Sequence, residues 1–186
     1  MDENAGLGLN LVTREDCVFV IIDAQERLMP VIAAKEAVIQ NMFRLVKFAQ
    51  LFDIPIVITE QEKLGPTVAE IASEVLGVCP VKKVHFNCFM STEFDHKIRQ
   101  IEKKTLIIAG AEAHICVAQT ALYALPLYKV HIIADAVGSR SMENRNIAIE
   151  RVRQAGATIT TTEMFMYEIL QRAGTDKFKV ALQLVK

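Results

Sequence analysis

Three residues that lie far apart in the sequence carry side chains suited to nucleophilic catalysis. Asp23 follows the apolar run VFVII, Lys83 lies in PVKKVHF and Cys116 lies in GAEAHICVAQ. A carboxylate at an apolar strand end can act as a general base. A thiol at the start of an apolar helix faces free amide groups and the positive end of the helix dipole, which together with a nearby lysine lower the thiol pKa. Taken one at a time, they are more simply explained as a turn aspartate, a solvated lysine and a small buried cysteine.

The elements that must position these residues alternate along the chain. Short β-branched runs at 18–22, 55–59, 81–84, 105–109, 130–134 and 158–161 predict strands. Segments of helical period are predicted at 34–51, after Pro66, at 92–103, from 116 onward, between Ser141 and Gly156, at 162–173 and at 175–185. Thr67 and Glu70 have the spacing of a capping box.

This alternation predicts an α/β fold with three αβα layers and a doubly wound parallel sheet of about six strands. We expect a single domain over residues 1–186, because no repeat or linker-like segment divides the chain. Ligands of such sheets bind beyond the carboxyl ends of the strands. Asp23 and Cys116 follow predicted strands, and Lys83 lies within one, so convergence at that edge would make them one site.

Composition excludes several classes of partner. With 21 Lys and Arg against 22 Asp and Glu, a net charge of -1 and a pI near 6.4, the chain has no basic stripe for a phosphate backbone, so we expect no nucleic-acid partner. The N-terminus is acidic and lacks an apolar signal region, and no apolar run is long enough to cross a bilayer. We therefore expect a cytoplasmic protein without a membrane partner.

The cysteines and histidines show no metal-binding pattern. No C-x-x-C pair is present, and the four histidines, His85, His96, His114 and His131, lack metal-ligand spacing. Cys17, Cys79 and Cys88 are predicted to serve packing, and His131 to be a packed sheet residue. We predict neither a metal nor another cofactor.

The chain resembles the isochorismatase-like cysteine hydrolases in three separate motifs. These are Asp23 in VIIDAQ, Lys83 in the K-x-x-F segment KVHF and Cys116 in the G-x-x-x-x-x-C loop GAEAHIC. The resemblance runs from about Thr13 onward, and TEQEKLGPTVAEI and HIIADAVGSRSMENR look most like the isochorismatase-domain-containing subgroup. It implies a catalytic triad of these three residues and a homo-oligomer. It also implies a cis peptide between Ala111 and Glu112, with the backbone N–H groups of Glu112 and Cys116 forming the oxyanion hole.

The reaction implied by this resemblance is hydrolysis of a small amide through a thioester on Cys116. Nicotinamidases of the family hold a metal through histidines after the second strand, but the matching stretch ITEQEKLGPTV contains none. Two alternatives stay open: a vinyl-ether hydrolase of the isochorismatase type, in which Asp23 protonates the substrate and Cys116 is a bystander, and a non-catalytic oligomeric scaffold. The predicted substrate-binding residues are Leu28, Glu60, Gln61, Phe86 and His114, with Glu60 equally suited to accepting a loop hydrogen bond.

Overall fold

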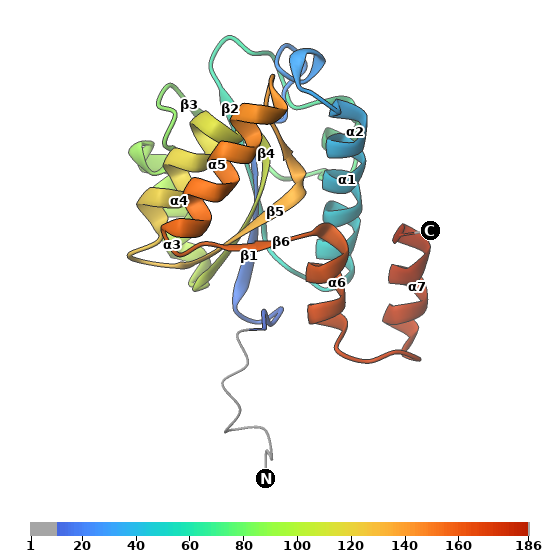
Figure 1. The fold of residues 1–186 in the computed structure, drawn as a ribbon. Helices are drawn as coiled ribbons and strands as arrows, with labels where there is room; N and C mark the ends of the chain where they lie inside the picture. Colours follow the sequence, from blue (N-terminus) through green and yellow to red (C-terminus); the bar gives the residue numbers. More distant parts are fainter. Residues whose placement is uncertain (1–10, 186) are drawn as a thin grey trace.

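A computed structural model describes residues 11–185 of the chain. Six strands form one parallel sheet in the order β3-β2-β1-β4-β5-β6 (Figure 1). Their bounds are β1 Cys17–Ile22, β2 Ile56–Gln61, β3 Val81–Lys83, β4 Thr105–Ala111, β5 Lys129–Gly138 and β6 Thr158–Thr160. The doubly wound α/β fold predicted from the alternating pattern is confirmed.

Helices cover both faces of the sheet. In Figure 1, α1, α6 and α7 lie on one side of it and α3, α4 and α5 on the other. The helices are α1 Lys35–Leu51, α2 Ala69–Ala72, α3 Thr92–Ile101, α4 Ala118–Ala124, α5 Met142–Gln154, α6 Thr162–Leu170 and α7 Asp176–Val185, with short 3-10 turns η1 Met29–Val31 and η2 Cys88–Met90 and a π-helical turn η3 Ala113–Val117. Helices α3 and α6 end before the predicted residues 103 and 173, because Glu102 and Gln171 take positive φ angles of 56° and 57°.

Two hydrophobic cores fill the space between the layers. Strand β1 is buried along its whole length, and its successive side chains point to opposite faces. Phe19 and Ile21 enter the core under α1, whereas Val18 and Val20 enter the core under α3 and α4. A strand buried on both faces reads as a continuous apolar run, which explains the sequence before Asp23.

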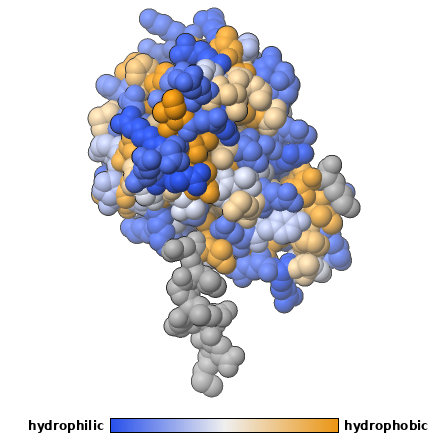
Figure 2. Space-filling model, in the orientation of Figure 1, coloured by the Kyte–Doolittle hydropathy of each residue, from blue (hydrophilic) through white to orange (hydrophobic). Residues whose placement is uncertain are grey.

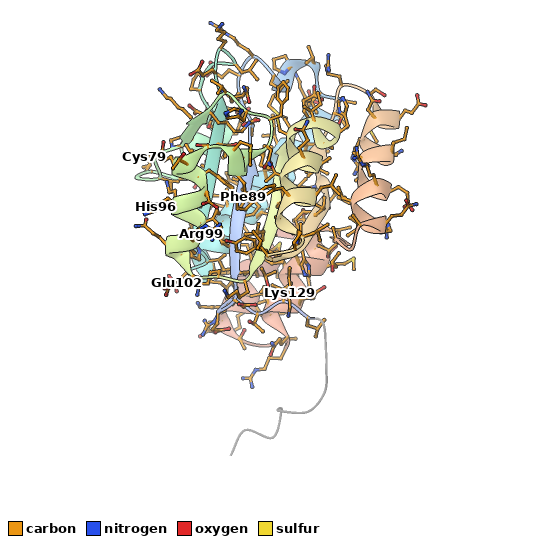
Figure 3. The ribbon with its side chains drawn as sticks, turned by 90° about the vertical axis from the view of Figure 1, so that its left-hand side faces the viewer. Cys79, Phe89, His96, Arg99, Glu102 and Lys129 are labelled. Carbon is orange, nitrogen blue, oxygen red and sulfur yellow. The ribbon has the colours of Figure 1, made fainter. Side chains whose placement is uncertain are left out.

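The outer surfaces of the helices are mostly polar, with exposed apolar side chains that include Tyr123 of α4, Ile147 of α5 and Met164 of α6. Figure 2 shows hydrophilic side chains over the outward face of α5. Figure 3 turns the side of α3 toward the viewer, where His96 and Cys79 lie at the outer edge and Phe89 lies further in. Cys79 is exposed, so its predicted packing role is wrong, whereas Cys17 and Cys88 are buried as predicted.

The predicted capping box after Pro66 is also wrong. Helix α2 has Val68 as its N-cap and receives no side-chain capping bond. The N–H and the hydroxyl of Thr67 both donate to Glu60 Oε1, each at 2.8 Å. Thr67 is therefore committed to the end of β2 and cannot cap the helix.

His131 is a packed sheet residue, as predicted, and is only 5% exposed. Burial, assisted by the nearby Lys129 ammonium, lowers the pKa of His131 to about 4. The unfolded chain, where histidine titrates near 6.5, therefore binds a proton that the folded protein does not bind until the pH falls to about 4. Within this window the free energy of unfolding should fall with falling pH, by ~3 kcal/mol at most.

Substituting His131→Gln should remove much of this acid-side loss, measured by urea unfolding at pH 7, 5.5 and 4. The matched control is His96→Gln, which changes an exposed histidine of α3. Equal pH dependence in the two variants would show that His131 does not carry the effect.

Candidate active site

The candidate residues are placed by the carboxyl ends of three strands. Asp23 directly follows β1, Lys83 is the last residue of β3, and Cys116 lies in η3 beyond β4. Strands β1 and β4 are neighbours at the centre of the sheet, where the strand order reverses direction. Such a switch point is where doubly wound sheets bind their ligands.

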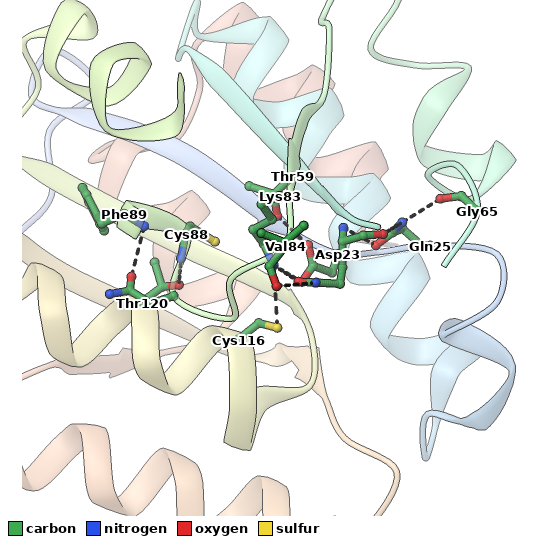
Figure 4. A network of polar contacts seen from close by, with 12 residues as sticks. Asp23, Gln25, Thr59, Gly65, Lys83, Val84, Cys88, Phe89, Cys116 and Thr120 are labelled. Atoms are coloured by element: carbon green, nitrogen blue, oxygen red, sulfur yellow. Dashed lines mark hydrogen bonds and ion pairs between the residues drawn. The ribbon is translucent and has the colours of Figure 1, made fainter. Parts of the chain in front are cut away.

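The Lys83 ammonium contacts both other candidate residues, Asp23 and Cys116. Strand β2 lies between β3 and β1, so the long lysine side chain has to reach past the end of β2 to meet Asp23. Its Nζ lies 2.7 Å from Asp23 Oδ2, 2.8 Å from Gln61 Oε1 and 3.7 Å from Cys116 Sγ (Figure 4). These contacts account for the three N–H groups of the ammonium. The side chains of the Asp23–Lys83 pair are 1% and 0% exposed, so this ion pair is screened little by solvent.

The charge on Lys83 is held by its partner. Burial would lower the pKa of Lys83, but the Asp23 carboxylate and the nearby cysteines outweigh it and raise the pKa above its ordinary value. Lys83 is thus a permanent cation at neutral pH.

The pKa of the Cys116 thiol is raised, whereas the sequence predicted a lowered pKa. Burial, followed by the negative charge of Asp23, raises the pKa of Cys116, and Lys83 offsets this only in part. The residue is 5% exposed and lies within η3, before α4 begins at Ala118. The expectation of a low-pKa thiolate is therefore wrong, because it weighed a helix N-terminus and left out desolvation.

The loop before Cys116 is held by a second group of polar side chains. Glu112 takes φ 53°, and its carbonyl accepts from the N–H groups of Ile115 and Val117 at 2.9 and 3.4 Å. Its carboxylate accepts from Arg140 Nε at 2.7 Å and lies 3.0 Å from His114 Nδ1. Within residues 11–185 no peptide bond is cis, so the implied cis bond before Glu112 is wrong for this structure; the loop turns at the positive φ of Glu112 instead.

Thr59 and Gln25 belong to the site but were missed by the sequence reasoning. The Thr59 hydroxyl donates to Asp23 Oδ1 at 2.7 Å, and its carbonyl accepts from the Asp23 N–H at 3.2 Å. Gln25 is buried and spans the loop after β2, donating to the carbonyls of Gln61 and Gly65 and accepting from the Gln61 N–H. The available signals were the β2 position of Thr59, beside the end of β1, and the spacing of Gln25 two residues after Asp23.

The five predicted substrate-binding residues differ in exposure and in whether their polar groups are already hydrogen-bonded. Leu28 is half-buried, and Phe86 is exposed in the loop after β3. His114 Nδ1 lies 3.0 Å from Ser139 Oγ. Gln61 accepts from Lys83 and donates to the Val84 carbonyl, so both ends of its amide are occupied. The Glu60 carboxylate receives Thr67, as described above.

The described residues contain neither a cluster of metal-binding side chains nor a membrane-spanning helix. Across residues 11–185, no three His, Cys, Asp or Glu side chains are grouped so that they could hold a metal ion. No helix in the same range has the length and apolar character to span a membrane.

Known proteins are similar to this chain in sequence and in fold. Isochorismatase domain-containing protein 2A of Mus musculus is 32% identical over 185 residues, which cover 98% of this chain and 88% of the mouse protein. The solved structure of the MAR1 ribonuclease of Caenorhabditis elegans has a TM-score of 0.88 and 28% identity, and the match covers 94% of this chain and 92% of that one. YcaC of Escherichia coli, described as an octameric hydrolase of unknown specificity, has a TM-score of 0.89 and 22% identity. The match covers 96% of this chain and 92% of the YcaC chain, and at this identity it shows only that the two proteins share a fold. Because the model of the isochorismatase domain matches residues 17–164, which include β1 to β6 and all three converging side chains, the chain belongs to the isochorismatase domain family.

Proposed function

We propose that this protein is a cysteine hydrolase that needs no cofactor and cleaves the C–N bond of a small amide through a thioester on Cys116. The observation that carries the proposal is the buried contact of Lys83 Nζ with both Asp23 Oδ2 and Cys116 Sγ. Family membership supports a hydrolase. The acid, the cation and the thiol supply what attack on a carbonyl requires.

The first step follows from the protonation states. Because the pKa of Cys116 is raised, the thiol holds its proton at neutral pH, and the proton must leave as the sulfur attacks. Asp23 is the base that receives it, since its charge acts on the thiol directly. Lys83 orients the carboxylate, and its three N–H groups are already in use within the site.

The attack forms a C–S bond and places negative charge on the carbonyl oxygen. The backbone N–H groups of Glu112 and Cys116 are the proposed donors to this oxyanion, each contributing about 3 to 4 kcal/mol by comparison with other oxyanion holes. The ion pair of Glu112 with Arg140 would hold the first of these donors in place.

Two proton transfers complete the cycle. Asp23 returns its proton to the leaving nitrogen as the C–N bond breaks, which releases an amine and leaves the acyl group on sulfur. Asp23 then accepts a proton from a water that attacks the thioester. The C–S bond breaks, Cys116 regains its proton, and the acyl group leaves as a carboxylic acid.

Specificity and assembly complete the proposal. Leu28, Phe86 and His114 would contact the substrate, whereas Gln61 and Glu60 would shape the loop after β2. We expect a single domain that assembles into a cytoplasmic homo-oligomer; YcaC, which has the same fold, is described as octameric. Small molecules are the expected substrates.

One observation favours the vinyl-ether hydrolase as a second candidate. Burial and the charge of Asp23 raise the pKa of the Cys116 thiol, and a cysteine that takes no part in the reaction would be held in the same way. In that reaction Asp23 protonates the substrate, and no acyl group is attached to Cys116.

Intact-protein mass spectrometry during turnover of a panel of small carboxamides distinguishes the two. We expect a mass increase equal to the acyl group, mapped by peptide sequencing to Cys116, and its loss together with turnover in Cys116→Ala. Cys79→Ala, which removes the exposed thiol, is the matched control and should keep both. Hydrolysis of a small vinyl ether included in the panel, retained in Cys116→Ala, would instead support the ether reaction, and hydrolysis of a short single-stranded RNA included in the panel would contradict a small-molecule substrate.

A further inference from the structure

Thr59 holds Asp23 at two points. Its hydroxyl donates to one carboxylate oxygen of Asp23, and its carbonyl accepts the Asp23 N–H. The residue is 0% exposed, and Figure 4 shows it beside Asp23 and Lys83. Thr59 pairs with Ile22, the last residue of β1, so its hydroxyl bond joins β2 to the residue that directly follows β1.

The two bonds act on a strained residue. Asp23 takes φ 51°, a conformation that a residue with a side chain adopts at a cost. The carbonyl of Thr59 fixes the backbone of that turn, while its hydroxyl and the Lys83 ammonium take different oxygens of the carboxylate. With one donor on Oδ1 and another on Oδ2, the plane of the carboxylate is fixed relative to the Cys116 sulfur.

We propose that Thr59 is a positioning residue of the hydrolysis, orienting Asp23 toward Cys116 and setting how readily the carboxylate accepts the thiol proton. This inference rests on the proposed function, in which Asp23 is the base. A hydroxyl suits the task because it stabilises the ionised carboxylate without adding a second cation beside Lys83.

Other groups facing Asp23 define what the hydroxyl adds. Lys83 approaches from β3, Cys116 from η3 and Cys88 from η2, and the charge of Asp23 acts on all three. Lys83 is the cation among them, and the two cysteines are thiols with raised pKa values. A Thr59→Val substitution would leave these three groups and the Thr59 carbonyl in place and remove only the hydroxyl.

The test is the pH dependence of Cys116 alkylation by acrylamide, followed from pH 2.5 to 10 by mass spectrometry of the Cys116 peptide. If Asp23 receives the thiol proton, the rate falls on the acid side as Asp23 becomes protonated. Losing one hydrogen bond to the ionised form should move the midpoint of this fall upward by about one pH unit in Thr59→Val. Thr59→Ser keeps a hydroxyl and should restore the midpoint of the unmodified protein.

Thr120→Val is the matched control. Thr120 is equally buried, and its hydroxyl accepts the Cys88 N–H at 3.0 Å. Its loss should leave the acid-side midpoint unchanged even if stability falls. A midpoint shift of equal size in both variants, or no shift in Thr59→Val, would overturn the role of Thr59.

Asp23→Asn separates this inference from the proposed function. If Asp23 is the base, this variant has no acid-side midpoint, and its rate falls steadily with falling pH as the small thiolate fraction of Cys116 falls. A Thr59→Val midpoint that then stays in place contradicts only the inference about Thr59. If Asp23→Asn keeps the midpoint, Asp23 is not the base, and the proposed function fails with the inference.

Discussion

Replacing Lys83 with methionine is expected to destabilise the protein by about 3 to 5 kcal/mol and to abolish acylation of Cys116. Methionine is close to lysine in length, so the main change is the loss of the ammonium group. The side chains of Lys83 and Asp23 are 0% and 1% exposed, so the substitution would leave Asp23 in the interior without its cation. The measurement is urea unfolding at pH 7, together with mass spectrometry for the acyl adduct.

The neighbouring Lys82 supplies a matched control. It precedes Lys83 in β3 but is exposed, so Lys82→Met should change the free energy of unfolding by no more than about 0.5 kcal/mol. The double variant Asp23→Asn, Lys83→Met removes both charges and should recover much of the stability lost in Lys83→Met. A double variant as unstable as the single one would show that packing of the lysine, and not charge pairing, carries the effect.

The sequence was sufficient to predict the layers, the existence of the six strands and the three converging side chains, although β5 runs to Gly138, four residues beyond its predicted end. Buried parallel strands leave a strong pattern, because both faces are apolar and each run stops where a polar residue leaves the sheet. Asp23 and Cys116 follow such stops and Lys83 ends its strand, so the topology alone brings them to one edge.

Residues whose types are ordinary for their element could not be recognised in the same way. Threonine is common in strands, so its residue type does not distinguish Thr59 from Thr105 or Thr160; only its place in β2, opposite the end of β1, does. The bond from Thr67 to Glu60 also depends on how the loop folds back, and the same residues fit a helix cap by spacing.

The protonation state of Cys116 shows a further limit. A lysine and a helix start are visible in the sequence and both favour a thiolate. The degree of burial and the approach of Asp23 depend on the folded geometry, and they raise the pKa of the thiol. The chemistry therefore depends on a base acting during the attack.

Gly110→Ala is expected to prevent folding or to cost more than about 3 kcal/mol. Gly110 pairs with Ile22 across β4 and β1, and its φ is +129°. A Cβ atom here would lie 2.0 Å from the Ile22 carbonyl oxygen and 2.6 Å from its nitrogen. Both atoms belong to the backbone just before Asp23, so no side-chain rotation can relieve the clash.

The same substitution at Gly77 isolates the clash from the cost of the backbone conformation. Gly77 also has a positive φ, +90°, but a Cβ added there meets nothing within 4 Å. Gly77→Ala should therefore cost only about 1 to 2 kcal/mol, from placing a side chain in a left-handed conformation. Thermal unfolding followed by circular dichroism compares the two. A Gly110→Ala protein as stable as Gly77→Ala would mean that β1 and β4 can separate at their carboxyl ends without loss of the fold, and the fixed spacing of Asp23 and Cys116 could then not be attributed to this close contact.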